Sequence, residues 1–235
     1  MKEYHKIETL FNRAVDGSKK LIVNSWRNET VEFLKNNRWH FTEKIDGTNI
    51  RVNWDGRKVT FGGRTDRANI PAKLVAFLND TFGSNEAEQI FEQKFGETEV
   101  TLYGEGYGAG IQSGGNYRPD VCFILFDVLI GDIWLTRESV EDIAEAFGID
   151  VVPFLGVGTL DDAIRIVMDK PTSKIGTAPM EGIVARPAVE VRDRLGRRVI
   201  VKIKVKDFAG LCVAVDRLNR RVGDDLMERM EDDGR

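Results

Sequence analysis

The chain has few of the residues that carry the commonest catalytic and metal-binding chemistry. It contains two histidines, His5 and His40, and two cysteines, Cys122 and Cys212, which lie far apart and form no C-x-x-C pair. A structural zinc site is nearly excluded, because such sites use closely spaced Cys and His ligands. The scarcity of histidine also argues against Ser-His-Asp and Cys-His catalysis. The cysteine pattern fits a reducing cytoplasmic location.

The sequence also lacks a long apolar segment. Its first ten residues are charged and contain no apolar signal-peptide core. The longest apolar run, residues 121–130, has about half the length of a membrane span and contains Asp127. We therefore expect neither an export signal nor a transmembrane helix, and no membrane partner.

An excess of positive charge is absent as well. The 235 residues include 34 Lys and Arg against 38 Asp and Glu, a formal net charge of −4. A general cationic coat is excluded, so any nucleic-acid site must be a local patch. Residues 192–207 hold seven basic residues against two acids, whereas residues 224–235 hold six acids against two arginines. The overall charge thus conceals a basic hairpin and an acidic tail.

Strand and helix patterns alternate along the chain, and 42% of its residues are hydrophobic, enough for a substantial core. Helices are expected at residues 29–37, 73–78, 85–95, 139–147 and 160–168. Strands are expected at residues 39–44, 50–54, 58–61, 99–103, 122–130, 181–186, 189–192 and 198–204. We predict one α+β domain of antiparallel sheets flanked by helices over residues 1–208, followed by a short helical, acidic tail at residues 209–235.

Turn residues refine this prediction. Asp55-Gly56 predicts a type I′ hairpin turn, and Gly131-Asp132 and Leu195-Gly196 predict two more hairpins. Pro71 opens one helix and Asn85 is the expected N-cap of the next. The glycine-dense residues 104–115 predict a loop.

Residues 44–49, Lys-Ile-Asp-Gly-Thr-Asn, form the most informative segment, a lysine that leads into a tight turn between strands. A lysine ammonium with a pKa of about 10.4 is a poor nucleophile, but neighbouring cations such as those of the basic hairpin can lower that pKa. Alone, the pattern is equally compatible with a solvated lysine before an ordinary turn.

Other nucleotide-binding motifs fit poorly. Residues 104–109 match the G-x-G-x-x-A of a dinucleotide fingerprint, but residues 112–116 cannot readily continue as a helix. The sequence contains no G-x-x-x-x-G-K-[ST] phosphate loop. We expect these glycines to let the backbone pass close to Glu105 and the substrate.

Six segments occur in the order typical of one enzyme superfamily, each on an expected strand or strand end. Over residues 39–208 the chain resembles the covalent nucleotidyltransferases, the ATP-dependent ligases and mRNA capping enzymes, and among them the RNA ligase 2 family. The matches are K-x-[DH]-G-T-N at residues 44–49, Arg-Thr-Gly/Asp at 64–66, a strand ending in Gly-Glu at 102–105, aromatic-Asp at 126–127, E-G-x-V at 181–184, and K-x-K at 202–204.

The resemblance implies a nucleotidyltransferase domain of the ATP-grasp-like ligase fold and a set of site residues. Lys44 is the implied site of AMP attachment, with Lys202 and Lys204 as further catalytic residues. The implied nucleotide contacts are Glu43, Asn49, Arg64, Glu105, Phe126, Glu181 and Arg186. Phe126 would stack on adenine, and Arg186 stands where the family often has a lysine. Asp46 and Glu181 are the implied ligands of Mg²⁺ or Mn²⁺.

The implied activity is that of an ATP-dependent RNA ligase. It would join 5′-phosphate and 3′-hydroxyl ends through a lysyl-AMP and an adenylated 5′ end, with a nicked duplex or an RNA/DNA hybrid among the candidate substrates. Three alternatives stay open: a DNA ligase, although that family has an arginine at the position of Asn49, a capping-type guanylyltransferase, and a non-catalytic nucleic-acid-binding relic that uses residues 192–206.

The chain departs from the family after Phe208. Residues 209–235 are too few for the OB-fold or helical domain that follows the catalytic domain in related ligases. We therefore expect either an accessory protein that supplies this domain or an activity limited to ends that are already adenylated.

Overall fold

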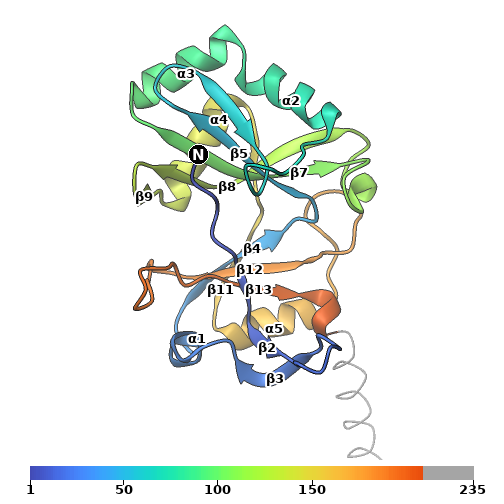
Figure 1. Cartoon of the computed structure of the whole chain (residues 1–235). Coiled ribbons are helices and arrows are strands. Elements are labelled where there is room, and N and C mark those ends of the chain that lie inside the picture. Colours follow the sequence, from blue (N-terminus) through green and yellow to red (C-terminus); the bar gives the residue numbers. More distant parts are fainter. Residues whose placement is uncertain (209–235) are drawn as a thin grey trace, which may run out of the picture. The chain divides into compact units, whose positions relative to one another are not determined.

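The computed structural model describes residues 1–208, so the predicted acidic tail lies outside the described residues (Figure 1). The chain divides into two compact units, each assembled from separate segments. The first unit contains Met1–Ile7, Thr42–Gly156 and Thr172–Glu181, and the second contains Glu8–Phe41, Val157–Pro171 and the chain from Gly182 onward. The predicted α+β class with antiparallel sheets is confirmed.

The first unit is built on a six-stranded sheet with the order β10-β8-β7-β5-β6, in which β9 also pairs with β8. The strands are β5 (Thr48–Trp54), β6 (Val59–Gly62), β7 (Val100–Gly108), β8 (Val121–Ile130), β9 (Ile133–Trp134) and β10 (Asp150–Val151). Strands β5 to β8 pair antiparallel, and β10 runs parallel to β8.

The two faces of this sheet differ because side chains alternate along each strand. Ile50, Val52 and Trp54 face the core, together with apolar residues of α2 (Ala72–Phe82), α3 (Asn85–Phe95) and α4 (Arg137–Phe147). Asn49 and Arg51 face the opposite side, which we call the polar face.

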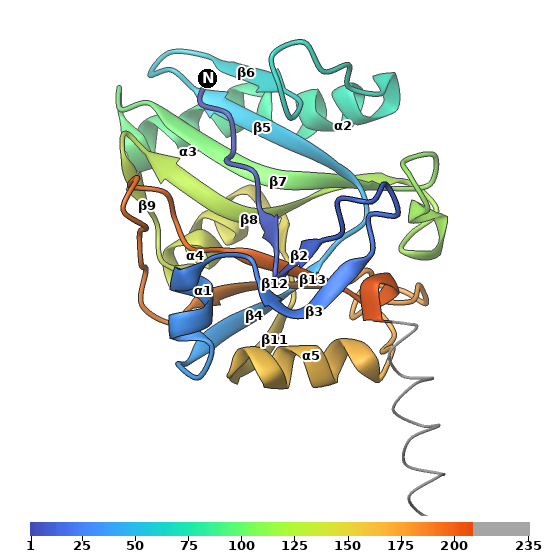
Figure 2. The ribbon, with the colours of Figure 1, turned by 60° about the horizontal axis from the view of Figure 1, so that its bottom comes forward.

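The N-terminal segment, residues 1–7, contacts the polar face, as the dark blue trace in Figure 2 illustrates. Tyr103 donates a hydrogen bond from its hydroxyl to Lys2 O at 2.9 Å, and Arg51 donates from Nη1 to Met1 O at 3.1 Å. The segment therefore belongs to the first unit although it begins the chain.

The second unit contains a five-stranded sheet with the order β1-β13-β12-β4-β11 and a two-stranded sheet of β2 and β3. The bounds are β1 (Glu8–Thr9), β2 (Phe11–Arg13), β3 (Leu21–Trp26), β4 (Trp39–Lys44), β11 (Phe154–Gly158), β12 (Gly182–Pro187) and β13 (Val201–Lys204). The boundary between the units cuts through two strands, so residues 42–44 of β4 and residues 154–156 of β11 belong to the first unit. Helix α1 is Glu29–Leu34, and α5, Leu160–Met168, contacts β12 and β13.

Most predicted helices and strands are confirmed, because their signals are local. Helix α5 begins at a capping box of Thr159 and Asp162, and Pro71 directly precedes α2. The predicted cap at Asn85 is wrong, because the Ser84 hydroxyl accepts from Ala87 N at 3.1 Å.

Several boundaries also differ from the prediction. Strand β7 continues to Gly108, so the first part of the predicted glycine loop is strand, and a 3-10 turn follows at Gly114–Asn116. The Asp55-Gly56 turn is not type I′, because only Gly56 has a positive φ, 94°. Residues 189–192 do not form the predicted strand. Of these residues, Arg192 forms an isolated bridge with Arg198. Strands β1, β2, β3, β10 and β11 were not predicted.

No helix within residues 1–208 combines the length and the apolar character needed to cross a membrane.

Candidate active site

Lys44 ends β4 and leads through Asp46 and Gly47 into β5. The turn presses against β7, where a Cβ added at Gly47 would lie 2.3 Å from Gly106 O and 2.8 Å from Glu105 Cγ. Only glycine fits this close approach. The conformation of the turn therefore ties the position of Lys44 to that of Glu105.

The Lys44 ammonium forms an ion pair with Glu181. Nζ lies 2.6 Å from Glu181 Oε2 and 3.4 Å from Ile45 O, and the two side chains are 22% and 15% exposed. Glu181 ends the segment Thr172–Glu181, so residues 137 positions apart meet here. This pair must open before Nζ can act as a nucleophile.

Glu105 lies on β7 opposite Asn49 of β5, on the polar face of the sheet. The pKa of Glu105 is raised to about 8, mainly by burial, which Lys44 opposes and to which the carboxylates of Glu181 and Asp46 add. Most Glu105 side chains are therefore protonated at neutral pH and can donate a hydrogen bond.

Asn49 presents an unsatisfied acceptor next to Glu105. Its Oδ1 atom is buried and has no hydrogen-bond partner within residues 1–208. An unpaired buried acceptor costs free energy, so such an atom indicates a place where a ligand supplies the donor.

Glu43 is buried, at 1% exposure, and its carboxylate holds a loop. Oε1 accepts a hydrogen bond from the Ser173 hydroxyl, and Oε2 accepts from Lys174 N at 2.8 Å. Both oxygens are thus engaged with the loop that ends at Glu181. The nucleotide contact expected of Glu43 stays a prediction. The sequence offers no signal for Ser173 as its partner, because 130 residues separate them.

Phe126 occupies a bulge of β8. Tyr103 pairs with Asp127 and Gly104 with Leu125, which leaves Phe126 outside the pairing with β7. The ring of Tyr4 stands edge-on to Phe126, with centroids 5.1 Å apart, and the Tyr4 hydroxyl donates to Asp127 Oδ2 at 2.8 Å. Tyr4 was missed by sequence analysis, since nothing in its charged surroundings indicated a place on this sheet.

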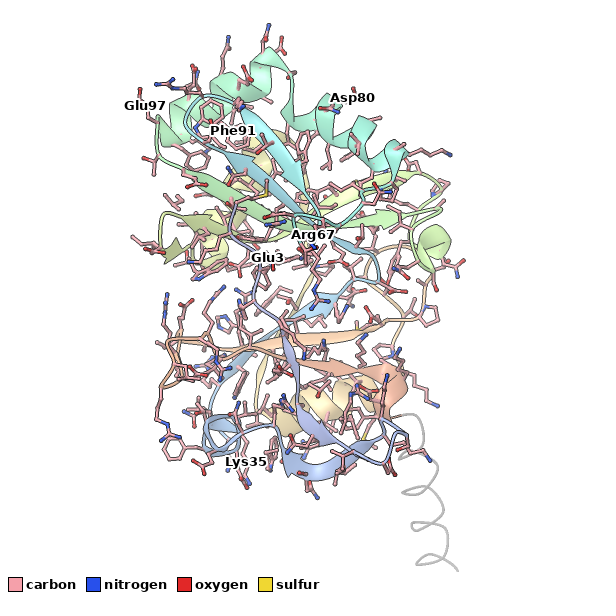
Figure 3. All side chains as sticks on the ribbon, in the orientation of Figure 1. Glu3, Lys35, Arg67, Asp80, Phe91 and Glu97 are labelled. Carbon is pink, nitrogen blue, oxygen red and sulfur yellow. The ribbon has the colours of Figure 1, made fainter. Side chains whose placement is uncertain are left out.

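Arg64 is exposed on the segment between β6 and α2, which also carries Arg67, labelled in Figure 3. Its neighbour Asp66 accepts from Arg51 Nη2 at 2.8 Å. Arg51 is fully buried and was also missed. The signal that could have pointed to Arg51 is a charged residue within the alternating pattern of a strand.

Arg186, Lys202 and Lys204 lie in the second unit on one face of its sheet. Val184 pairs with Lys202 and Gly182 with Lys204, so alternation turns the three cations the same way. Residues of the intervening positions, such as Ile183 and Ile203, are buried. Three cations on one face suit phosphate groups.

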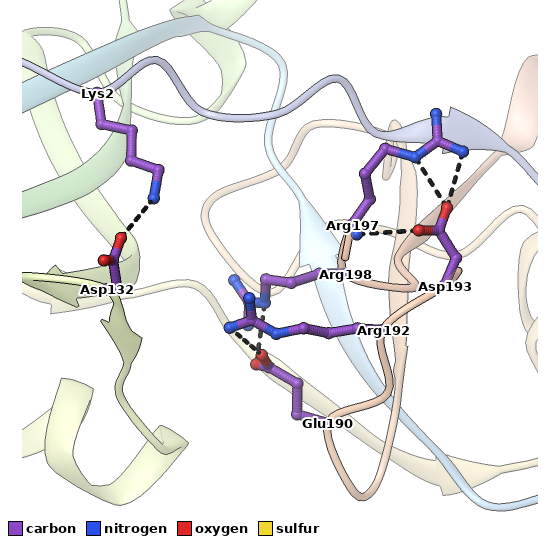
Figure 4. Close-up of polar contacts among 7 residues, drawn as sticks. All are labelled: Lys2, Asp132, Glu190, Arg192, Asp193, Arg197 and Arg198. Carbon is purple, nitrogen blue, oxygen red and sulfur yellow. Dashed lines mark hydrogen bonds and ion pairs between the residues drawn. The ribbon is translucent and has the colours of Figure 1, made fainter. Parts of the chain in front are cut away.

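The arginines of the predicted basic hairpin are largely neutralised within it (Figure 4). Glu190 pairs with Arg192 at 3.3 Å and with Arg198 at 3.0 Å, and Asp193 pairs with Arg197 at 2.7 Å. The positive charge of residues 192–198 is thus lower than the count of their arginines suggested.

The residue types at Asp46 and Glu181 suit a divalent ion. Both carboxylates act on Glu105 electrostatically, and Mg²⁺ commonly binds one or two carboxylates together with substrate phosphates. Within residues 1–208 no group of three or more His, Cys, Asp or Glu side chains could hold a metal on its own. A metal here would thus depend on further ligands from a bound nucleotide or water.

Comparison with known proteins identifies the family. The sequence model of the family described as RNA ligase matches residues 37–204, about seven tenths of the chain. No curated protein matches the chain.

Solved structures of a Naegleria gruberi RNA ligase are similar in fold. A mutant without ligand has 19% identity and a TM-score of 0.57, and the match covers 74% of this chain and 51% of that one. A mutant with AMP and Mn has 18% identity and a TM-score of 0.57, covering 74% and 52%. A mutant with ATP and Mn has 16% identity and a TM-score of 0.57, covering 85% and 58%.

The chain thus spans between half and three fifths of the length of these ligases. The structural likeness confirms the predicted ligase fold, and the sequence match covers all six motifs. The chain belongs to the RNA ligase family.

Proposed function

We propose that the chain is an ATP-dependent RNA ligase that acts through a lysyl-AMP at Lys44. The observation that carries this proposal is the position of Lys44, whose Nζ lies 2.6 Å from Glu181 on a turn pressed against Glu105. Solved relatives with ATP and Mn, and with AMP and Mn, support ATP and a divalent ion as ligands.

In the first step Nζ of Lys44 attacks the α-phosphorus of ATP. An N–P bond forms, the bond to the pyrophosphate oxygen breaks, and Nζ gives up two of its three ammonium protons to solvent or a neighbouring base. Asn49 Oδ1 offers an acceptor and Glu105 a donor for the nucleotide. Phe126 offers its ring to adenine, and Arg64 contacts phosphate.

Charge on the phosphates is offset in this proposal by Arg186, Lys202 and Lys204. A divalent ion, Mg²⁺ or Mn²⁺, would be held by Asp46 and Glu181 and would neutralise phosphate oxygens. Glu43 contributes by holding the loop that ends at Glu181, in addition to any contact with the nucleotide.

In the second step AMP passes from Lys44 to a 5′-phosphate, which breaks the N–P bond and forms a pyrophosphate linkage. In the third, a 3′-hydroxyl attacks the 5′-phosphate and AMP leaves. The substrate is RNA with these ends, including nicked duplexes and RNA/DNA hybrids. An accessory protein that contributes to substrate binding is part of the proposal.

The location proposed for the protein is a reducing one inside the cell. Cys122 is a buried free cysteine, which is usual in such a location.

Covalent labelling tests the proposal. The full chain is incubated with α-labelled ATP or GTP and Mg²⁺ or Mn²⁺, and the label is followed on denaturing gels. We expect ATP to label the parent and Lys94→Ala, which changes an exposed lysine of α3, but not Lys44→Ala.

Three outcomes favour the alternatives. Labelling by GTP alone indicates a capping-type guanylyltransferase. Sealing of DNA 3′-hydroxyl strands alone indicates a DNA ligase. A parent that never acquires AMP, together with Lys44→Ala protein that binds RNA as the parent does, indicates a non-catalytic relic.

A further inference from the structure

Residues 63–68, which we call the arginine loop, follow β6 and carry two exposed arginines, Arg64 and Arg67. Neither arginine takes part in an ion pair within residues 1–208. They differ in this respect from Arg192, Arg197 and Arg198 of the hairpin, which are paired with Glu190 or Asp193. A phosphate that binds the arginine loop thus displaces no protein carboxylate.

A buried guanidinium fixes the conformation of the arginine loop. Arg51 is fully buried, donates from Nε to Gly63 O at 2.7 Å, and pairs through Nη2 with Asp66 at 2.8 Å. Ala68 N donates to Thr65 O at 3.1 Å and closes the turn. Arg51 also neutralises Asp66, the acidic residue of the loop, so the remaining charge of the loop comes from its arginines.

The position of the arginine loop on the sheet links it to the candidate active site. Arg51 of β5 pairs with Gly62 of β6, and Asn49 pairs with Glu105. Strand β6 ends at Gly62, and Asn49 lies only two residues from Arg51 along β5. The loop therefore leaves the sheet beside the residues proposed to hold the nucleotide.

We propose that the arginine loop binds the sugar-phosphate backbone of the RNA next to the join, and that Arg67 contacts an RNA phosphate beside the nucleotide that Arg64 contacts. Arg51 is a positioning residue that holds both arginines in place. This inference rests on the proposed RNA ligase function. The contacts are with phosphates, so the loop adds affinity without selecting a base sequence.

Binding of a nicked RNA duplex, measured by fluorescence anisotropy without ATP or metal, tests the role of Arg67. We expect Arg67→Ala to weaken binding roughly tenfold and to lower the slope of log affinity against log salt by about one unit. Arg57→Ala is the matched control, because it removes the same charge from the far end of β6, where Arg57 is exposed. It should bind nearly as the parent does.

Equal affinity of Arg67→Ala and the parent would overturn the proposal, as would equal losses in Arg67→Ala and Arg57→Ala, which would indicate a general charge effect. Lysyl-AMP formation by the parent, measured on the same preparation, tests the proposed function separately. A parent that acquires AMP but fails the binding comparison contradicts only the inference about the loop.

The role of Arg51 is tested through its exposed partner. Asp66→Asn removes a negative charge, which by charge alone would tighten RNA binding, but it also removes the ion pair that fixes the loop. We expect binding several-fold weaker than that of Asp80→Asn, which removes an exposed charge from α2 (Figure 3). Tighter binding by Asp66→Asn would show that Arg51 does not position the loop for RNA.

Discussion

Glu105 couples the stability of the chain to its chemistry. Its pKa is raised by burial from an ordinary value of 4.5 to about 8. Between these values the folded chain holds a proton that the unfolded chain releases, so the free energy of unfolding falls as pH rises from about 4.5 to about 8. Lys44 is the nearby charge that limits the shift.

Replacement of Glu105 by Gln, which keeps the shape of the side chain but cannot ionise, should remove this dependence. We expect the melting temperature of the parent to fall relative to that of Glu105→Gln between pH 5 and pH 8. Each kcal/mol corresponds to about 2–4 °C for a chain of this size. Thermal unfolding followed by circular dichroism at pH 5, 6, 7 and 8 measures the difference.

Glu92→Gln on α3 is the control for this comparison, because Glu92 is exposed. The melting temperature of Glu92→Gln should change with pH as that of the parent does. If Glu105→Gln also runs parallel to the parent, the carboxyl is ionised across this range and the argument for a protonated Glu105 is wrong.

At the scale of elements, the segment Thr172–Glu181 shows how a loop depends on a buried anchor. Glu43 of β4 accepts hydrogen bonds from Ser173 and Lys174, and Glu181 at the end of the same segment pairs with Lys44. One contact lies near the start of the segment and the other at its end. Loss of the first should therefore affect the second.

We expect Ser173→Ala to lower the free energy of unfolding by about 1–3 kcal/mol, because it leaves a buried carboxylate oxygen without its donor. Lysyl-AMP formation should slow as well, with a larger effect on the rate constant than on the ATP concentration at half-maximal rate. Urea denaturation and single-turnover labelling measure the two effects.

Ser113→Ala serves as the control, because Ser113 is exposed and its side chain makes no capping hydrogen bond to the 3-10 turn. Unchanged labelling by a Ser173→Ala protein of reduced stability would show that the anchor is structural and does not position Glu181.

The elements that the sequence predicts are those with local causes. Helices α4 and α5 were predicted from apolar periodicity, and the hairpin of β5 and β6 was predicted from alternation around Asp55 and Gly56. The predicted type I′ turn is wrong because four residues separate Trp54 from Val59 and only Gly56 adopts a positive φ.

From the residue pattern alone, the candidate site is predictable only where its residues are contiguous, and Glu105 and Glu181 were found through the resemblance to a family. Lys44, Asp46 and Asn49 lie in one motif and could be found together. Tyr4 and Arg51 could not, because their positions depend on partners brought near by folding: Asp127 lies 123 positions from Tyr4, and the Arg51 contacts join β5 to the arginine loop. A buried charge inside an alternating strand carries no information about its partner.

At the scale of the whole molecule, the net charge of −4 opposes the binding of a polyanion. Cations of the first unit, such as Arg64, and of the second unit, such as Lys202, are therefore local exceptions on an acidic chain. Six acidic residues within residues 224–235 contribute strongly to this balance. Because net charge acts over distance, its effect on the rate at which RNA associates should be screened by salt.

Neutralising these six acids should raise the net charge from −4 to +2 and changes none of the proposed site residues. The changes are Asp→Asn and Glu→Gln at Asp224, Asp225, Glu228, Glu231, Asp232 and Asp233. We expect RNA to associate several-fold faster at an ionic strength of about 0.05 M, with the gain vanishing by about 0.3 M, because long-range attraction is screened. Stopped-flow fluorescence across this range measures the rate. A gain that persists at high salt would instead mean that the acidic side chains compete directly with RNA for its binding site, since a contact of that kind is screened far less than a distant charge.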